Sequence, residues 1–290
     1  MAGASSKRKP FRRPEGLSLV FDGAPSVWHD PLAVPFDTAR LDSLLLTGFV
    51  GRNVSYHESV DTTMRIAAEL AAAGAPEGTI VLAEEQTAGR GRMQRSWVSP
   101  PGVNLYFTIV LRPNLDELRY LAVIAPLSVC LAIEETTGLF PRIKWPNDVL
   151  IEGKKVSGIL LESEITDSDV LYATHGIGIN CNFDASEHEE IRDIATSLRS
   201  ELGRDVSREE VLAATLNHFE SLYEALRRGE VVSMDWKQRL DTLGKQVRIE
   251  RAGGGFEAGT VVDADSDGSL ILRRDDGSHV RIESGEVLGR

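Results

Sequence analysis

The chain contains few cysteines. Only Cys130 and Cys181 occur among its 290 residues, and they lie far apart in the sequence. No Cys-x-x-Cys pair and no Cys/His spacing typical of a zinc site is present, so the composition predicts no bound zinc. We expect two reduced, buried thiols in a cytoplasmic protein.

A surplus of positive charge and a long apolar run are also missing. The chain has 44 acidic and 32 basic residues, a net charge of -12 and a pI of about 5.1. Neutralising phosphates over a broad surface requires the opposite balance, so this charge argues against a nucleic-acid partner but leaves a local basic pocket open. The longest apolar stretch lies within Leu121–Ile133, which is shorter than the roughly 18 residues of a membrane span. We therefore expect no membrane partner.

The N-terminal segment is basic, but no apolar run follows its lysines and arginines. A secretory signal is therefore not expected, while a transit peptide stays an open alternative. Residues 1–36 are rich in Pro, Gly and basic residues and show weak periodicity, which predicts a poorly ordered arm. A winged helix-turn-helix would need three periodic helices and more residues than this segment offers.

The rest of the chain has ordinary globular composition, with 42% hydrophobic and 26% charged residues. Its length favours two domains, or one large domain with a small partner. Apolar spacing and capping residues predict helices over Asp37–Leu46, Asp61–Ala73, Leu118–Thr137 and Arg208–Leu226. Strands are predicted over Thr79–Ala83, Asn104–Leu111, Arg142–Trp145, Asp148–Ile151, Lys155–Glu162 and Val170–Asn180. This mixture predicts an α/β (α+β) domain, with a mixed sheet backed by helices, over residues 37–242.

After Gly244 the pattern changes to short strand-like runs separated by turns that contain glycine. The runs are Gln246–Glu250, Ala258–Val262, Leu270–Arg273 and Val280–Ile282. Regular short strands of this kind indicate a small β-barrel of about 45 residues, which we expect to be SH3-like and to span residues 243–290. Asp263–Gly268 copies the first half of a calcium-binding loop, but Arg274 stands at the twelfth position, so we expect an acidic β-turn instead.

One basic loop stands out in this acidic chain. Three arginines lie within Arg90–Arg95, and Gly89 and Gly91 are interleaved with them. Glycine lets a backbone approach a ligand closely, and arginine offers a rigid fork of donors to a carboxylate or phosphate. Because the loop follows a predicted strand and precedes Trp97, we expect it to fold over an anionic ligand. A solvated, mobile loop is the alternative.

A second polar segment is Lys144–Asp148, with Lys154–Leu160 after it. Its Trp-Pro pair restricts the chain direction, and Asn147 and Asp148 then enter a strand, where polar groups are costly to bury without partners. The functional interpretation of Lys155 is a cation held near a carboxylate as it attacks a phosphate. The alternatives are a structural turn, capped by Asn147 and Asp148, and an exposed lysine.

A third segment is His175–Asn180. Two glycines inside a strand often mark the close approach of a ligand or of another backbone, and Asn180 at the strand end could contact an adenine or a phosphate oxygen. A bulge is the alternative. Cys181 stands where a dinucleotide-binding motif needs its third glycine, and the chain has no Walker-type sequence, so both of those nucleotide motifs are excluded.

In this order and spacing the three segments resemble the biotin–protein ligases, of the monofunctional type without a DNA-binding domain. The matching positions are Gln86, Gly89–Arg92, Arg95–Trp97, Lys144–Asp148, Lys155 and Gly176–Asn180. The resemblance covers about residues 40–290, and the terminal β-barrel lies where that family carries one. It therefore extends over both predicted domains.

The resemblance implies an ATP-dependent ligase. Biotin and ATP would give biotinyl-5'-AMP and pyrophosphate, with Mg²⁺ shielding the phosphates, and the biotinyl group would pass to a lysine of a biotin carboxyl carrier domain. No metal site of the protein itself is implied, because Mg²⁺ would arrive on the ATP phosphates. The implied partner is the carrier protein of a biotin-dependent carboxylase, with a homodimer left open.

The resemblance also assigns roles to residues. Arg92 and Lys155 would be catalytic. The positions implied for biotin are Thr62, Thr63, Gln86, Gly89, Arg90, Gly91, Arg92, Lys155, Gly176 and Gly178. Those implied for ATP are Arg92, Arg95, Trp97, Asn147, Asp148 and Asn180. The chain departs from the family's usual Ser-Thr-Asn at Thr62–Met64, which removes an amide, and it has Gln94 where the family often has glycine, which changes loop mobility.

Three rival functions stay open from the sequence. A lipoate–protein ligase would use a related fold, a biotin-sensing repressor would need a DNA-binding domain, and an idle biotin-binding module would bind without catalysis. The acidic charge and the missing helix-turn-helix weigh against the repressor.

Overall fold

The computed structural model describes residues 35–251 and 254–288. The arm predicted over residues 1–36 therefore lies almost wholly outside the described residues. Seven strands form the larger sheet in the order β1-β2-β3-β7-β6-β5-β4. They are β1 (Val54–Val60), β2 (Ile80–Gln86), β3 (Leu105–Leu111), β4 (Arg142–Lys144), β5 (Asp148–Ile151), β6 (Lys154–Ile165) and β7 (Val170–Ile179). Only β1 and β2 pair in parallel, and the other neighbours are antiparallel, so the predicted mixed sheet is confirmed.

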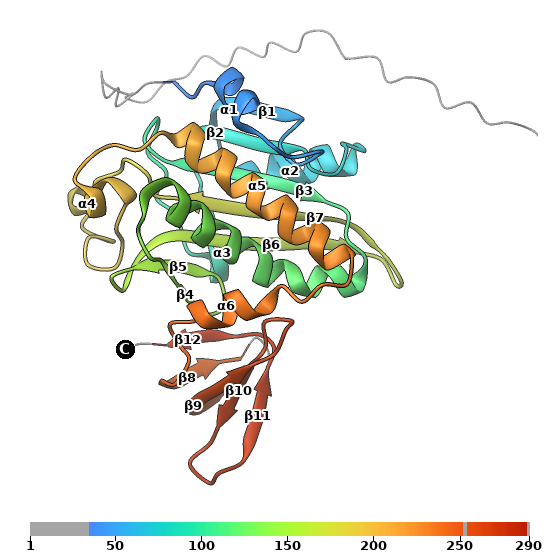
Figure 1. The fold of residues 1–290 in the computed structure, drawn as a ribbon, viewed down its shortest axis with the longest axis vertical. Helices are drawn as coiled ribbons and strands as arrows, with labels where there is room; N and C mark the ends of the chain where they lie inside the picture. The colour runs from blue at the N-terminus through green and yellow to red at the C-terminus, as the bar shows by residue number, and fades with distance from the viewer. Residues whose placement is uncertain (1–34, 252–253, 289–290) are drawn as a thin grey trace, which may run out of the picture. The chain divides into compact units, whose positions relative to one another are not determined.

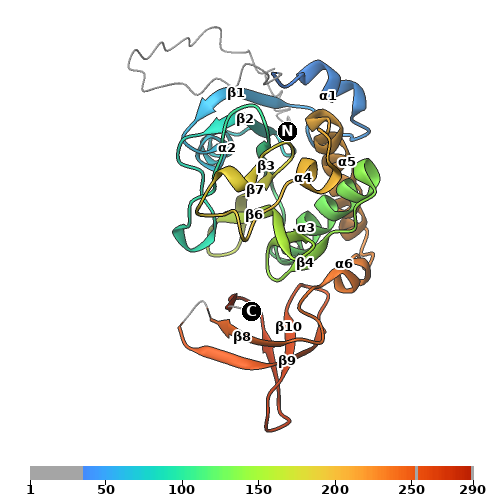
Figure 2. The ribbon, with the colours of Figure 1, turned by 90° about the vertical axis from the view of Figure 1, so that its left-hand side faces the viewer.

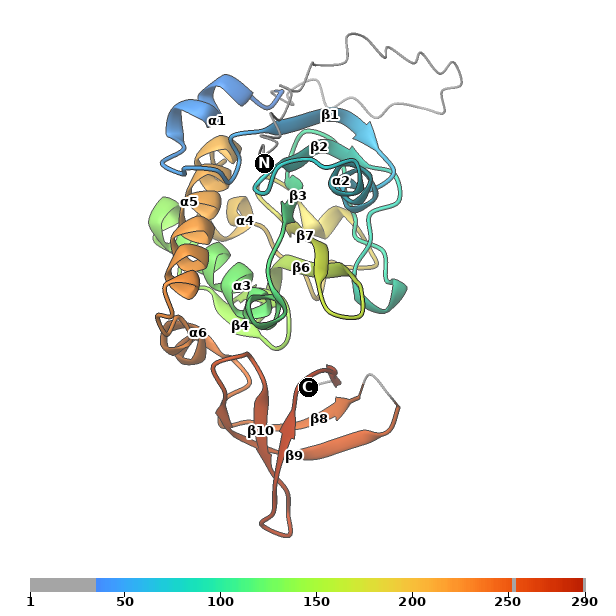
Figure 3. The ribbon, with the colours of Figure 1, turned by 90° about the vertical axis from the view of Figure 1, so that its right-hand side faces the viewer.

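Helices cover both faces of this sheet. They are α1 (Thr38–Leu44), α2 (Thr63–Ala72), α3 (Leu115–Thr137), α4 (Leu198–Leu202), α5 (Arg208–Arg227) and α6 (Ser233–Arg239), with short 3-10 turns at Arg92–Gln94 and Ala185–Glu187. Helix α2 packs on one face, while α3 and α5 pack against each other on the opposite face (Figures 1, 2 and 3). Every side chain of β3 is buried, as expected for a central strand with both faces covered.

The ends of α3 follow from its sequence. Asn114 accepts a hydrogen bond from the Glu117 backbone N–H, and the Glu117 side chain accepts one in return from the backbone N–H of Asn114, which makes a capping box. Gly138 ends the helix with a φ of 75°, a conformation that favours glycine. Apolar residues on nearly all sides of α3 are buried, since sheet, α5 and α6 surround it.

The C-terminal strands form a separate antiparallel sheet. They are β8 (Gln246–Glu250), β9 (Phe256–Ala264), β10 (Leu270–Arg273), β11 (His279–Ile282) and β12 (Glu286–Leu288), in the order β11-β10-β9-β8-β12. Within the described residues the outer strands β11 and β12 do not pair with each other, so strand pairing does not close the expected barrel. Strands of four and three residues are short for closure.

Two smaller expectations, on the cysteines and on the acidic turn, are confirmed. Cys130 and Cys181 are free and buried, and burial raises the pKa of both thiols. The acidic turn is confirmed between β9 and β10, where Arg281 forms ion pairs with Asp265 and Asp267. No cluster of three or more His, Cys, Asp or Glu side chains able to hold a metal occurs among residues 35–251 and 254–288. In the same residues, no helix is both long and apolar enough to cross a membrane.

Candidate active site

The three segments singled out in the sequence line one pocket of about 640 Å³. Strands β4 to β7, the start of α2, the loop after β2 and the residues around β8 and β12 contribute its walls. The expected site residues that line it are Thr62, Thr63, Gln86, Arg90, Gly91, Arg92, Arg95, Trp97, Asn147, Asp148, Lys155, Gly176, Gly178 and Asn180. The basic loop therefore contributes to the wall of a cavity, while Arg90 and the segment Met93–Ser96 are exposed, so its closure over an anionic ligand stays a prediction.

Gly89 is the exception, because it does not line the pocket. A Cβ at this position would lie 2.5 Å from the carbonyl oxygen of Trp97. The Trp97 N–H donates to the Gly89 carbonyl at 2.9 Å, and the Gly91 N–H donates to the Arg95 carbonyl at 2.7 Å. Gly89 thus permits a tight return of the loop, and its expected contact with a ligand stays a prediction.

The tip of this loop has an unusual backbone. Met93 and Gln94 have φ angles of 54° and 59°, in the left-handed region that costs energy for a side chain other than glycine. This conformation explains why glycine suits the position of Gln94. Met93 is 61% exposed, so packing does little to hold the tip in place.

One end of the pocket is neutral, polar and closely hydrogen-bonded. The Thr63 backbone N–H donates to Gln86 Oε1 at 2.9 Å, and the Thr108 hydroxyl donates to the Thr63 hydroxyl at 2.8 Å. Thr63 and Thr108 are both buried. The Thr62 hydroxyl is buried too, yet no described group bonds to it. This end, which we call the amide end, suits a neutral group that can accept or donate hydrogen bonds.

Two glycines of β7 leave room for large side chains in the pocket wall. A Cβ on Gly176 would lie 2.6 Å from Met64 Sδ, and one on Gly178 would lie 2.6 Å from the Trp97 indole. Strand β7 keeps a regular register with β3 and β6 through this stretch, so the alternative of a bulge is wrong. Met64 therefore lies in the pocket wall, at the position where the family usually has an asparagine.

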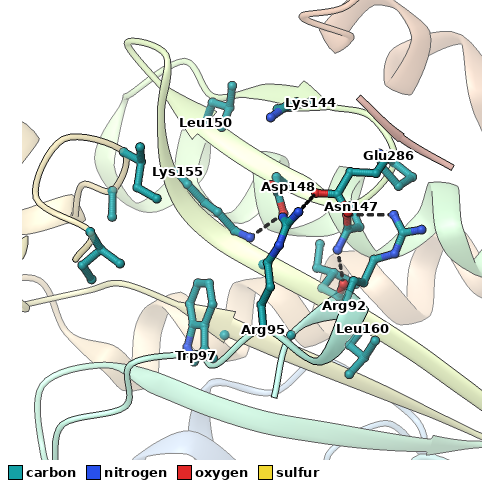
Figure 4. A pocket seen from close by; sticks show the side chains of 18 of the residues that line it. Arg92, Arg95, Trp97, Lys144, Asn147, Asp148, Leu150, Lys155, Leu160 and Glu286 are labelled. Atoms are coloured by element: carbon teal, nitrogen blue, oxygen red, sulfur yellow. Dashed lines mark hydrogen bonds and ion pairs between the residues drawn. The ribbon is translucent and has the colours of Figure 1, made fainter. Parts of the chain in front are cut away.

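The other end of the pocket is cationic. Arg92 donates to the Gly285 carbonyl at 3.1 Å and to Asn147 Oδ1 at 3.4 Å, while Arg95 forms an ion pair with Glu286 (Figure 4). Burial lowers the pKa of Arg92, and the nearby carboxylates of Glu286 and Asp148 act in the opposite direction. An arginine keeps its charge at neutral pH even so. We call this region, which includes Lys155, the cationic end.

Lys155 faces the same end from β6. Its Nζ lies 2.6 Å from Asp148 Oδ1 and 5.2 Å from the centroid of the Trp97 ring (Figure 4). A register shift between Val149 and Leu150 sets Lys155 opposite Leu150, whose side chain also lines the pocket. Lys155 is thus held by a carboxylate and an aromatic ring, and the alternative of an ordinary exposed lysine is wrong.

The two asparagines use their amide groups within the protein. Asn147 Nδ2 donates to the Ile159 carbonyl at 2.6 Å, and Asn180 Nδ2 donates to the Thr196 carbonyl at 2.9 Å. Both residues line the pocket, but these bonds anchor neighbouring backbone. These bonds differ from the expected capping of backbone N–H groups by Asn147, and the contacts of both asparagines with a nucleotide stay predictions.

Several lining residues were not expected from the sequence. Glu286 belongs to the three-residue strand β12, which no pattern indicated, and Lys245 precedes β8. Lys144 was recognised as part of a motif but given no role. The loop residues Ile191, Asp193, Ile194 and Ala195 also line the pocket, and their sequence carried no signal that we identified.

Comparison with known proteins places this architecture in a class. The sequence profile of the "Biotin/lipoate A/B protein ligase family" matches residues 56–180, and that of the "Biotin protein ligase C terminal domain" matches residues 242–288. Both matches point to the biotin and lipoate protein ligases as the class of enzyme that the fold and the pocket define.

Individual relatives narrow the class. The "Bifunctional ligase/repressor BirA" of Bacillus subtilis is 37% identical over 80% of this chain and 73% of its own length. The "Biotin--[acetyl-CoA-carboxylase] ligase" of Paracoccus denitrificans is 37% identical over 72% of this chain and 89% of its own. The biotin protein ligase of Aquifex aeolicus, solved with biotin and ATP, has a TM-score of 0.70 and 32% identity, covering 82% of this chain and 98% of that one. This chain therefore belongs to the biotin protein ligase family, a family of ligases.

Proposed function

We propose that this chain activates biotin with ATP and transfers it to a lysine of a biotin carboxyl carrier domain. The observation that carries the proposal is the division of one pocket into a neutral, hydrogen-bonding amide end and a cationic end with Arg92 and Lys155. Biotin has a neutral ring at one end and a carboxylate at the other, so its two ends match the two ends of the pocket. Biotin and ATP are bound together in the related structure from Aquifex aeolicus.

In the first step two anions must meet. A biotin carboxylate oxygen attacks the α-phosphorus of ATP, a new P–O bond forms, and the bond from that phosphorus to the bridging oxygen breaks. Pyrophosphate leaves with the electron pair, and biotinyl-5'-AMP remains. Arg92 and Lys155 would offset the repulsion of the two anions and the charge that develops at the α-phosphate.

The same pocket would hold the product of this step. The amide end, with Thr62, Thr63 and Gln86, would bind the biotin ring, and the backbone of Gly91, Gly176 and Gly178 would line the acyl chain. The nucleotide would contact Arg95, Trp97, Asn147, Asp148 and Asn180, and Arg90 would close over the acyl side. Trp97 packs on the glycines of β6 and β7 and lines the pocket, where its indole would stack on adenine.

In the second step the lysine amine of the carrier attacks the acyl carbon. A C–N bond forms, the bond from the acyl carbon to the phosphate oxygen breaks, AMP leaves and a proton is lost from the nitrogen. The mixed anhydride must be kept from water until then, and a closed Arg90–Arg95 loop would exclude it. The contacts of Arg92 and Arg95 with the segment around β12 support such a closed state.

Mg²⁺ is included in the proposal as the ion carried by the ATP phosphates. Asp148 fits this assignment, because it is a carboxylate that lines the pocket beside Lys155, and Mg²⁺ accepts one or two carboxylates besides phosphate oxygens. When bound, the ion would withdraw charge from the phosphates.

The proposal also covers the domain boundaries, the localisation and the partner protein. Residues 37–242 would form the catalytic domain, residues 243–290 the C-terminal domain, and the protein would act in the cytoplasm on the carrier protein of a biotin-dependent carboxylase. A homodimer stays open, and no nucleic acid or membrane partner is proposed.

The amide end favours biotin over lipoate. The buried Thr62 hydroxyl has no partner among the described residues, and a ureido ring can offer it one, whereas the dithiolane ring of lipoate carries no strong donor or acceptor. A site built to bond a polar group discriminates strongly against a ligand that lacks it. The amide end therefore supports a biotin–protein ligase better than a lipoate–protein ligase.

Incorporation of labelled biotin and of labelled lipoate into an apo carrier domain, with ATP, tests the proposal. We expect transfer of biotin only, and transfer of lipoate alone would reject the proposal. Pyrophosphate release on mixing biotin with ATP separates an enzyme from an idle binding module. A DNA shift in the presence of biotin and ATP would favour the repressor instead.

A further inference from the structure

The lysines and arginines that line the pocket differ in whether a carboxylate neutralises their charge. Among the described residues, four of them pair with carboxylates: Arg90 with Glu162, Arg95 with Glu286, Lys155 with Asp148 and Lys245 with Asp241. Arg92 bonds only to neutral oxygen atoms. Lys144, which is half-buried, has neither an ion pair nor a hydrogen bond within the residues that the structure describes. Two positive charges in the pocket are thus left for an anionic ligand.

The register of the sheet fixes the face on which Lys144 lies. Lys144 is opposite Asp148 in the β4–β5 pair, and residues opposite each other on antiparallel strands project to the same face. Asp148 and Leu150 line the pocket from that face, and Ile143, between the positions of Arg142 and Lys144, points to the core instead. Figure 4 shows Lys144 on the same wall as Leu150 and Lys155.

The proposed reaction requires two anion sites along the nucleotide. Arg92 and Lys155 account for the biotin carboxylate and the α-phosphate, where the new bond forms. The β- and γ-phosphates carry most of the charge of ATP, and they leave together as pyrophosphate. Mg²⁺ would offset part of this charge. Among the described lysines and arginines that line the pocket, Lys144 has neither a carboxylate partner nor a role at the α-phosphate, so it is left for the leaving group.

We propose that Lys144 binds the β- and γ-phosphates of ATP and then the pyrophosphate that leaves. This inference rests on the proposed function, and it adds a subsite for the leaving group. Lys144 ends β4 and is followed within three residues by Asn147, which accepts a hydrogen bond from Arg92. One short segment would thereby connect the reacting phosphate and the leaving group.

The subsite predicts a selective defect. Biotinyl-5'-AMP has only the α-phosphate, so loss of Lys144 should leave its binding and its onward transfer unchanged. ATP and pyrophosphate should both bind more weakly. Loss of one charged hydrogen bond to a phosphate corresponds to about a tenfold weakening or more.

The test compares Lys144→Ala with the matched control Lys154→Ala, since Lys154 is an exposed lysine of β6 close to the same pocket. Purified enzyme loaded with biotinyl-5'-AMP is titrated with magnesium pyrophosphate, and ATP formation is followed. We expect the half-saturating pyrophosphate concentration to rise at least about tenfold in Lys144→Ala. Lys154→Ala should match the unsubstituted protein, and Lys144→Arg should recover most of the loss. The dissociation constant of biotinyl-5'-AMP and the transfer rate from it are measured in all variants.

Equal half-saturation in Lys144→Ala and the unsubstituted protein would overturn the subsite. An equal loss of biotinyl-5'-AMP binding would also overturn it, because Lys144 would then support the pocket as a whole. If the unsubstituted protein makes no ATP from biotinyl-5'-AMP, the proposed function itself fails. Calorimetric titration with magnesium pyrophosphate still decides the subsite in that case: binding lost only in Lys144→Ala supports it, and binding unchanged overturns it.

Discussion

The amide end and the cationic end of the pocket are held in different ways. At the amide end, Thr63, Gln86 and Thr108 bond to one another on β2, β3 and the start of α2, and the threonines are buried. At the cationic end, the loop tip is exposed and carries two residues at positive φ. Its arginines are held by a few polar contacts with the segment around β12.

In the proposed function, this difference would separate recognition of biotin from the chemistry of its activation. A site for the ring of a small acid gains affinity when it is formed before the ligand arrives, since little ordering is then required. A loop that must admit ATP, exclude water and later admit a carrier lysine has to open and close. We therefore expect substitutions at the two ends to change different measurable quantities.

The largest effect is expected at Lys155. Lys155→Ala should lower the rate of biotin adenylation by about 10²- to 10³-fold, because a cation positioned at the developing charge is lost. Lys154→Ala should leave that rate within about twofold, as its side chain is exposed. Biotin-dependent exchange of pyrophosphate into ATP measures both. Equal effects of the two substitutions would mean that the wrong lysine was assigned.

A smaller effect is expected at Arg92. Arg92→Gly removes the bonds to Gly285 and Asn147, so the loop should open more often and the adenylate should dissociate about tenfold faster or more. The released adenylate would label lysines of unrelated proteins. A filter-binding chase with labelled adenylate gives the dissociation rate, and Arg204→Gly, in an exposed loop, is the control. An unchanged adenylate lifetime would contradict the role of Arg92.

The amide end should respond through binding. Thr63→Val leaves the Thr108 hydroxyl without its acceptor, removes one of the two bonds from Thr63 to Gln86 Oε1, and removes a group proposed to face biotin. We expect the KM for biotin to rise about tenfold while kcat changes less, together with a loss of about 1–3 kcal/mol in the free energy of unfolding. Steady-state kinetics and denaturant unfolding test this. A fall in kcat with an unchanged KM would break the distinction between the two ends.

The smallest effect on activity is expected at His175 of β7, beneath the amide end, where the predicted change is in stability. Burial lowers the pKa of His175 from its usual 6.5 to about 3, and neither ring nitrogen has a described partner. Because the folded-state pKa is lower, the unfolded chain binds more protons below about pH 6.5, and stability falls as the pH falls through this range. The free energy of unfolding should decrease by up to about 1.4 kcal/mol per pH unit.

Urea unfolding between pH 7 and pH 4.5 measures this slope. His175→Leu should flatten it, and His279→Gln, at an exposed position of β11, should not. A slope that survives in His175→Leu would assign the pH dependence to other groups.

Much of the fold was accessible from the sequence because its signals are local. The helix at Leu115–Thr137 has a capping box and a C-terminal glycine, and β3 is a continuous apolar run. By contrast, β1 alternates polar residues and shows no long apolar pattern, and α6 begins without a side-chain cap. Strand β12 has three residues. These elements depend on contacts with a partner strand or helix, which a local pattern cannot indicate.

The site divides in the same way. Arg92, Lys155 and the two glycines of β7 stand in motifs, so their convergence could be predicted. Glu286 could not, since it meets Arg95 only after the C-terminal sheet has formed. The close packing at Gly89 also depends on a tertiary detail, the return of the Trp97 backbone across it.

The indole of Trp145 has a consequence for engineering this chain. Its Nε1–H donates to the Gly268 carbonyl at 2.8 Å, and the ring is buried. A truncation after Thr242 would remove the Gly268 carbonyl and leave the indole N–H without its acceptor. We expect this to cost about 1–3 kcal/mol of stability in the segment just before Asn147. Tags, split points and insertions are better placed in the exposed hairpin at Asp276–Gly277. Neither residue is among the described residues that line the pocket.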